Sequence, residues 1–207
     1  MKENVKSTVM PFNKFVDMDV PVVELRLYPN AKEFLFEYFA LLRRVFSDIL
    51  GLLETDYISI ALINPNGQLF FLSSKPSIEQ NLIEKNLWPF DGSYQEDFIY
   101  QEQPKLWSEL THLKDADLIK KYKQINPKLI NGISIPAEYL DYRIVVSFGF
   151  KKINPLIQNK KTDYCEKLLA MGKYCLQKID EEILFPDKKY FRTKPKLELI
   201  INNQVIL

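Results

Sequence analysis

The fold is decided by the stretch Leu129-Ile-Asn-Gly-Ile-Ser-Ile-Pro136, followed by Tyr142-Arg-Ile-Val-Val-Ser-Phe-Gly-Phe150. In the second segment, bulky Ile, Val and Phe side chains alternate with Arg, Val, Ser and Gly, which is the period of a β-strand. The first segment repeats the asymmetry, with Leu129, Ile133 and Ile135 on one face and Gly132 and Ser134 on the other. The pattern predicts two paired strands at the centre of a sheet that has a bulky face and a small face.

A second hairpin with the same asymmetry is predicted from 57–63 and 68–73, because Asn66-Gly67 between them is a strong turn signal. Ser59 and Ala61 occupy its small face, between larger apolar residues. Two interpretations of the small faces stay open. They form the floor of a ligand cavity, or their small side chains let a covering helix pack closely.

Helical spacing of apolar residues predicts helices over 31–53, 77–87, 117–123 and 162–184, with Asn30 and Asp115 as N-caps of the first and third. Combined with the hairpins, this order predicts an α/β (α+β) fold in which helices flank a central antiparallel sheet of about five strands. We expect residues 1–30 to form an N-terminal arm with a short strand at 22–27, residues 31–190 to form the main domain, and residues 191–207 to form a linker or tail. The apolar end of that tail is typical of a truncated chain.

The charge balance predicts no general attraction to nucleic acid, because 28 basic and 27 acidic residues give a net charge of +1. We expect no specific DNA binding by this chain alone. No uncharged apolar run is long enough to span a membrane, and the first residues do not resemble a secretory signal. The expected location is therefore the cytoplasm, without membrane contact.

The search for chemistry finds no catalytic constellation, so we predict that the chain is not an enzyme. His112 is the single histidine, and Cys165 and Cys175 fall ten residues apart on one predicted helix. Neither arrangement fits a metal site or a disulfide. The six glycines form no phosphate-binding loop. We expect no metal and no cofactor.

Five motifs follow one another between residues 31 and 190: Pro76, Asp91-Gly-Ser93, Leu106-Trp107, the 129–136 strand and Ile144-Val-Val-Ser-Phe148. In this order they resemble the N-terminal autoinducer-binding domain of LuxR-type quorum-sensing transcription regulators. The resemblance implies a GAF/PAS-like α-β-α sandwich that binds an acyl-homoserine lactone between its sheet and its helices. In that family a DNA-binding helix-turn-helix follows, which this chain does not include.

The resemblance also implies roles for individual residues. Asp91 matches the family aspartate that accepts a hydrogen bond from the ligand amide, and Trp107 matches a tryptophan of the pocket wall. Ser93 and Ser147 match small hydroxyl residues that line the pocket, and Gly132 matches a strand glycine that leaves space for the ligand. Together with the small-faced Ser59 and Ala61, these are the predicted ligand-binding residues: Ser59, Ala61, Asp91, Ser93, Trp107, Gly132 and Ser147.

The sequence departs from the family at three aromatic positions that contact the lactone, where it has Lys75, Glu79 and Ile83. We therefore expect charge from Lys75 and Glu79 near the ligand. The expectation is therefore a divergent or orphan sensor of a small amphipathic ligand, which does not use ordinary acyl-homoserine lactones and forms a homo- or heterodimer. The alternative is a stand-alone interaction protein that dimerises with a full-length regulator or another partner and binds no ligand.

Overall fold

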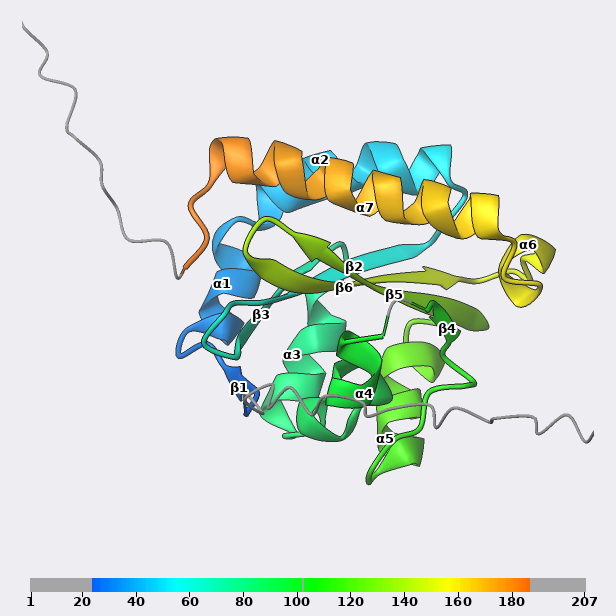
Figure 1. Ribbon diagram of the computed structural model, residues 1–207, viewed down its shortest axis with the longest axis horizontal. Coiled ribbons are helices and arrows are strands. Elements are labelled where there is room, and N and C mark those ends of the chain that lie inside the picture. The colour runs from blue at the N-terminus through cyan, green and yellow to red at the C-terminus, as the bar shows by residue number, and fades with distance from the viewer. Residues whose placement is uncertain (1–23, 102, 187–207) are drawn as a thin grey trace, which may run out of the picture.

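The computed structural model describes residues 24–101 and 103–186. These form three layers, in which a central sheet lies between the helix pair α2 and α7 and a second group of helices, α3 to α5 (Figure 1). Most of the expected N-terminal arm and the whole of the expected tail, 191–207, lie outside the described residues. The predicted α-β-α sandwich is confirmed.

The sheet has six strands in the order β1-β3-β2-β6-β5-β4. All neighbouring strands are antiparallel except β1 and β3, which are parallel. The count of about five was too low because the edge strands β1 and β4 have two residues each, too few to show a period. The bounds are β1 Arg26–Leu27, β2 Tyr57–Ile63, β3 Gln68–Ser73, β4 Lys105–Leu106, β5 Asn131–Tyr139 and β6 Tyr142–Phe150.

The helices of the two covering layers differ in length and regularity. The α-helices are α1 Ala31–Glu37, α2 Phe39–Leu52, α3 Pro76–Glu84, α4 Glu96–Ile99, α5 Ala116–Lys120, α6 Pro155–Gln158 and α7 Thr162–Glu182. Two 3-10 turns, η1 Trp88–Phe90 and η2 Gly92–Tyr94, precede α4, and the π-helical turn η3 Lys121–Ile125 continues α5. None of the helices in the described ranges is both long and apolar enough to cross a membrane.

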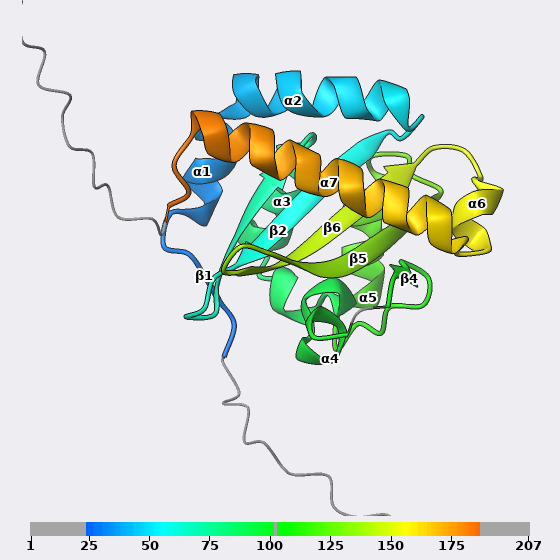
Figure 2. The ribbon, with the colours of Figure 1, turned by 45° about the horizontal axis from the view of Figure 1, so that its top comes forward.

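The bulky face of the sheet packs against α2 and α7, as the alternation predicts. Ile60, Val146 and Phe148 belong to one buried cluster with Phe46 of α2 and Leu168 of α7. Figure 2 shows these two helices lying side by side across the strands. At this layer's centre Gly172 of α7 lies against the Val146 side chain, so a small helical residue allows close approach to the sheet.

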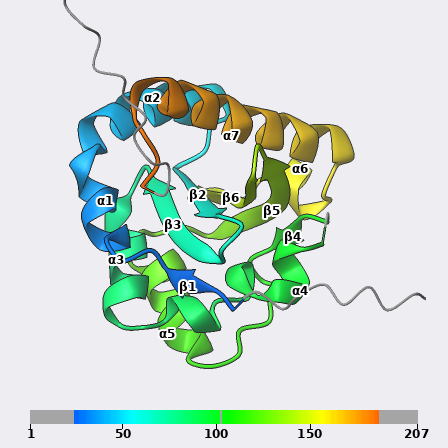
Figure 3. The ribbon, with the colours of Figure 1, turned by 60° about the vertical axis from the view of Figure 1, so that its left-hand side comes forward.

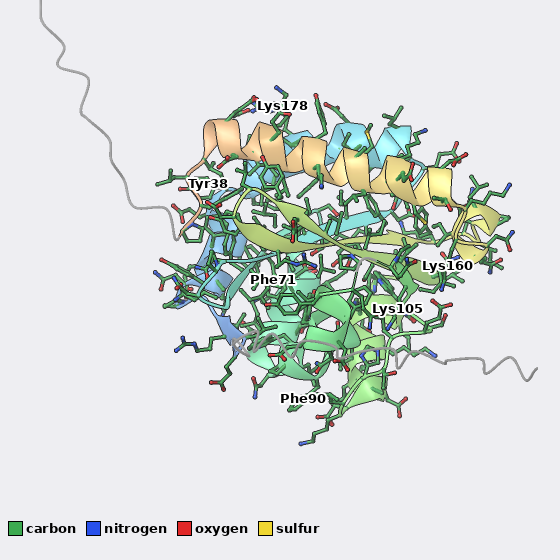
Figure 4. The ribbon with its side chains drawn as sticks, in the orientation of Figure 1. Tyr38, Phe71, Phe90, Lys105, Lys160 and Lys178 are labelled. Carbon is green, nitrogen blue, oxygen red and sulfur yellow. The ribbon has the colours of Figure 1, made fainter. Side chains whose placement is uncertain are left out.

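The small face packs against α3, α4 and α5 in a second buried cluster. Phe71 and Val145 of the sheet meet Ile78 of α3, Phe98 of α4 and Ile119 of α5. Figure 4 labels Phe71 on this lower side of the sheet. The layer contains the short helices and turns between residues 76 and 125, and these position the polar residues of the site.

Three local predictions were wrong. The helix expected over 31–53 is interrupted at Tyr38, so α1 covers the side of the sandwich near β3 and α3 while α2 packs with α7 (Figure 3). Asn30 and Asp115 occupy the N-cap positions of α1 and α5, but neither side chain makes a capping hydrogen bond, and Asp115 is in a left-handed conformation (φ 53°). Leu129 packs with the small-face cluster, because β5 begins only at Asn131 and the strand alternation does not extend back to it.

Candidate ligand-binding site

Four serines lie in register across the small face, and we call them the serine row. Strand pairing aligns Ser73 of β3 with Ser59 of β2, Ser59 with Ser147 of β6, and Ser147 with Ser134 of β5. All four are buried. Because hydroxyl groups at this depth require hydrogen-bond partners, the serine row determines which polar groups the covering helices place against the sheet.

A buried ion pair between Lys123 and Asp91 lies at the β5 end of the serine row. The Lys123 Nζ atom donates to Asp91 Oδ2 and to Ser93 Oγ, each at 2.7 Å. Asp91 Oδ1 accepts the backbone N–H of Ser93 at 2.9 Å, because Asp91 is the N-cap of η2. Both oxygens of this carboxylate are therefore already hydrogen-bonded within the chain.

Hydroxyl groups connect this ion pair to the sheet and to Trp107. Ser93 Oγ lies 3.4 Å from Ser134 Oγ, which in turn lies 2.8 Å from Ser147 Oγ. The indole Nε1 of Trp107 donates to Ser134 Oγ at 3.1 Å. The Trp107 ring lies against Gly132, where an added Cβ would be within 3.0 Å of three ring carbons. At this position the small face therefore admits a packed tryptophan from the turn that follows β4, and not a covering helix.

The helical segment that follows α5 delivers Lys123 to the interior. Lys123 comes four residues after the buried Ile119, and side chains at that spacing share a helix face. It lies in the π-helical turn 121–125, a rare conformation that is frequent at functional sites. Sequence reasoning missed Lys123, and the available signal was a lysine on the apolar face of the predicted helix 117–123.

The electrostatics favour a charged pair beside a neutral imidazole. Burial alone would raise the pKa of Asp91, but the charge and hydrogen bond of Lys123, with the Ser93 N–H, outweigh burial and lower that pKa overall. Burial lowers the pKa of His112, and the Lys123 charge contributes to this. Because His112 Nδ1 accepts the Gly92 N–H at 3.0 Å, the ring is neutral, and its 3.6 Å approach to Asp91 is not an ion pair.

Glu79 of α3 is buried against the other half of the serine row, among β2 and β3. The Tyr57 hydroxyl donates to its Oε1 atom. Its Oε2 atom and the Ser59 hydroxyl, both buried, have no hydrogen-bond partner among the described residues. Burial raises the pKa of Glu79, although Ser73, Tyr57 and Ser59 favour the ionised form. The Glu79 side chain is therefore a buried acid with spare hydrogen-bonding capacity.

A cavity of about 540 Å³ opens beside the ion pair, between the β5 edge and the α5 segment. This volume is within the range that accommodates small-molecule ligands. Apolar and polar residues both line it, including Trp107, Leu110, His112, Ile119, Lys120, Lys123, Ile130, Asn131, Gly132 and Ile153.

The seven predicted ligand-binding residues come together on the small face, but they do not share one cavity. Trp107 and Gly132 line the cavity just described. Asp91, Ser93 and Ser147 lie in the hydrogen-bonded network beside it, while Ser59 and Ala61 lie further across the sheet on β2. Their roles in binding stay predictions.

The three positions that depart from the family pattern have different environments. Glu79 is completely buried, Ile83 packs on the edge of the small-face cluster, and Lys75 is partly exposed at the start of α3. Sequence reasoning expected charge near the ligand at both Lys75 and Glu79. The structure places only the Glu79 carboxyl inside the sandwich.

Two solved structures share this arrangement of layers. The match to the crystal structure of Escherichia coli SdiA covers 78% of this chain and 73% of the SdiA chain, with a TM-score of 0.55 and 14% sequence identity. The chain has the fold of SdiA. SdiA in complex with octanoyl-rac-glycerol matches 78% of this chain and 71% of its own, with a TM-score of 0.54 and 15% identity. No protein-family model and no curated protein matches the chain.

SdiA is a LuxR-type regulator, so the family resemblance that the motifs indicated is confirmed at the level of the fold. The agreement includes the antiparallel sheet and the helices on both of its faces. In this chain the polar network and the cavity lie beside each other at the β5 end of the small face.

Proposed function

We propose that this chain is a small-molecule-sensing domain of a LuxR-like transcription regulator, located in the cytoplasm. Its ligand is a small amphipathic molecule that binds on the small face of the sheet under α3–α5. The supporting observations are the SdiA fold and the cavity that Trp107 and Gly132 line, two of the residues matched to the family's pocket. The role is binding, and we assign no catalytic step to the chain.

The ligand is not an ordinary acyl-homoserine lactone, and the Lys123–Asp91 ion pair carries this part of the proposal. In the resemblance, the aspartate accepts a hydrogen bond from the ligand amide. Here each Asp91 oxygen already accepts one hydrogen bond, from Ser93 or from Lys123, and a neutral amide would be an additional and weaker partner for this carboxylate than the ammonium group. Displacing Lys123 would leave a buried cation without its partner, which is costly.

The amphipathic character of the ligand is supported by the lining of the cavity and by the second neighbour. SdiA was solved with octanoyl-rac-glycerol, which combines a polar head with an eight-carbon acyl chain. The cavity likewise combines Leu110, Ile119 and Ile153 with polar side chains. A ligand of this kind would bury its chain on the apolar residues and keep its head near the polar ones.

Titration calorimetry of the purified chain tests this function. Octanoyl-rac-glycerol is expected to give saturable heat, whereas homoserine lactones with short and long acyl chains are expected to give none. A micromolar dissociation constant for any of these lactones would contradict the exclusion of lactones. Octanoyl-homoserine lactone is the matched control, because it has the same acyl chain with a different head.

Two observations favour the alternative, a stand-alone interaction protein that binds no ligand. Both Asp91 oxygens are hydrogen-bonded within the chain. Phe36 and Phe39 are exposed on α1 and α2, where a dimer partner would cover them. Light scattering with and without octanoyl-rac-glycerol separates the two functions. A stable dimer that takes up no amphiphile would support the alternative.

A further inference from the structure

Two basic side chains take part in the lining of the cavity beside Lys123. Lys120 and Lys123 line it together with a single acidic residue, Asp117. Lys120 is exposed and has no ion-pair partner among the described residues. The neutral His112 does not add to the charge but presents a polar ring to the cavity. Because Asp91 compensates Lys123 and Asp117 offsets Lys120, the charges around the cavity balance, and an anionic head would be held by direct hydrogen bonds from the lysines.

Lys123 keeps one donor for a ligand. An ammonium group has three N–H bonds, and Asp91 and Ser93 accept two of them. The Lys123 side chain is 4% exposed and lines the cavity. The third N–H has no hydrogen-bond acceptor among the described residues, and Nζ lies 5.1 Å and 5.8 Å from the ring centroids of Trp107 and Tyr94. A buried cation with an unused donor is a strong partner for an anionic oxygen.

Asn131 supplies an independent sign of a missing partner. Both its side-chain nitrogen and its side-chain oxygen are buried, and neither has a hydrogen-bond partner among the described residues. Asn131 lines the same cavity as Lys120 and Lys123. Unsatisfied amide atoms at this depth cost free energy, which a bound polar group would recover. The amide N–H can donate to an anionic oxygen, and the amide oxygen can accept from a hydroxyl group or water.

Apolar side chains extend from the cavity to the surface. Ile130 and Ile153 both line it and are 61% and 62% exposed. Exposed apolar residues beside a cavity are suited to a hydrocarbon chain. Figure 4 shows Lys105 and Lys160 at this same end of the sheet, where Lys160 pairs with Glu109 at 2.6 Å. Because Lys160 pairs with Glu109, the entrance has apolar surface and the Glu109 carboxylate beside it is not left unpaired.

From these observations we infer that the ligand is an anionic amphiphile, whose carboxylate or phosphate head binds Lys120, Lys123 and Asn131 while its hydrocarbon chain lies along Ile130 and Ile153. The inference rests on the proposed sensing function and names the chemical class of its ligand. A neutral head would leave Lys120 unpaired, and a cationic head would repel both lysines.

Titration calorimetry with ten-carbon probes tests the inference. Decanoate, decyl phosphate, decanoyl-rac-glycerol and decyltrimethylammonium share a chain length and differ in head charge, and each is kept below its micelle-forming concentration. One or both anions are expected to bind at least about tenfold more tightly than the glycerol ester, because charge-assisted hydrogen bonds exceed neutral ones. The comparison of the two anions tells which head the site prefers.

Lys120→Gln and Lys121→Gln form a matched pair of variants. Both remove one exposed lysine from the same helical segment, but only Lys120 lines the cavity. Lys120→Gln is expected to weaken binding of the preferred anion by at least about fivefold, and Lys121→Gln is expected to leave it unchanged. Asn131→Ala is expected to weaken binding of the same anion.

The outcomes separate this inference from the function on which it rests. Equal binding of the anions and the glycerol ester, with no effect of Lys120→Gln, would overturn the anionic ligand while leaving the sensing function in place. Tighter binding of the cationic probe would also overturn it. Absence of saturable binding by all four probes would overturn both.

Discussion

At the residue scale, the Lys123–Asp91 ion pair is a buried contact of the small-face layer that tolerates the loss of one partner poorly. Its partners lie 2.7 Å apart with side chains 4% and 0% exposed. Removing one member of such a pair leaves the other charged and buried. Lys123→Met is therefore expected to lower the free energy of unfolding by about 3–5 kcal/mol, measured by urea denaturation.

The double variant Lys123→Met/Asp91→Asn is the control for this prediction. Because it removes both charges, it is expected to recover a large part of the stability that Lys123→Met loses. If the double variant were as unstable as the sum of the two single variants, Lys123 and Asp91 would not be coupled and the assignment of the pair would be wrong.

Gly132 supports a second prediction at this scale. An added Cβ would collide with the Trp107 ring, whose indole is held by Ser134. Gly132→Ala is therefore expected to cost about 1–3 kcal/mol of unfolding free energy, as overpacking of a core does. Thermal denaturation checks this together with the change in tryptophan fluorescence that a displaced Trp107 would cause.

Gly51→Ala is the matched comparison for Gly132→Ala. A Cβ at Gly51 meets no atom within 4 Å, and the residue lies inside α2. The same substitution is therefore expected to stabilise the chain, by up to about 1 kcal/mol, through helix propensity. Equal effects at the two positions would contradict the close packing of Trp107 on Gly132.

The sequence predicted part of the site, and the reason lies in how the site is assembled. Asp91, Trp107 and Gly132 belong to motifs whose order along the chain is visible in the sequence. The partner of Asp91 is Lys123, 32 residues later, and a contact that distant has no local signature. Glu79 was expected to place a charge near the ligand, but burial favours its protonated form.

At the element scale, α3 carries a buried acid that makes stability depend on pH. Burial raises the folded-state pKa of Glu79 above its ordinary value. An acid whose pKa is higher in the folded state than in the unfolded state contributes stability that is fully present below the unfolded pKa. That stability is lost as pH rises through the folded pKa. The wild-type chain is therefore expected to lose melting temperature relative to Glu79→Gln as pH rises from mildly acidic to mildly alkaline.

Relative to Glu84→Gln, a variant on the same helix, the wild-type chain is expected to show the opposite trend and to lose melting temperature as pH falls. Lys32 hydrogen-bonds to Glu84 at 2.7 Å and lowers its pKa, so this contribution is present above the unfolded pKa and is lost as pH falls. The effect is small because both groups are exposed. If stability depended on pH in the same way at Glu79 and at Glu84, burial would not raise the pKa of Glu79.

The elements themselves were predicted where their periods are long. The four main strands and the helix α7 have alternation or helical spacing over six or more residues. The sequence missed the short helices α4 and α6 and the π-helical turn, because one turn shows no repeat. The interruption at Tyr38 was also missed, since apolar spacing continues through it and tertiary packing separates α1 from α2.

At the scale of the whole molecule, the three layers follow from the unequal faces of the sheet. The bulky face requires long amphipathic helices, which α2 and α7 supply, and the small face accepts side chains as large as Trp107. The sequence left open whether the small face is packed or hollow. The structure has both, because Trp107 fills the space over Gly132 while the cavity opens beside them.

Native mass spectrometry of the purified chain, before and after incubation with octanoyl-rac-glycerol and decanoate, tests the central claim of a ligand-sensing domain most directly. The expected result is a bare chain of 24.4 kDa, or its dimer, that gains one amphiphile per chain and loses it at higher collision energy. Trp107→Ala, which removes a wall of the cavity, is expected to reduce the bound fraction. A spectrum that contains only bare chains or bare dimers under every condition would contradict the account and favour the interaction protein.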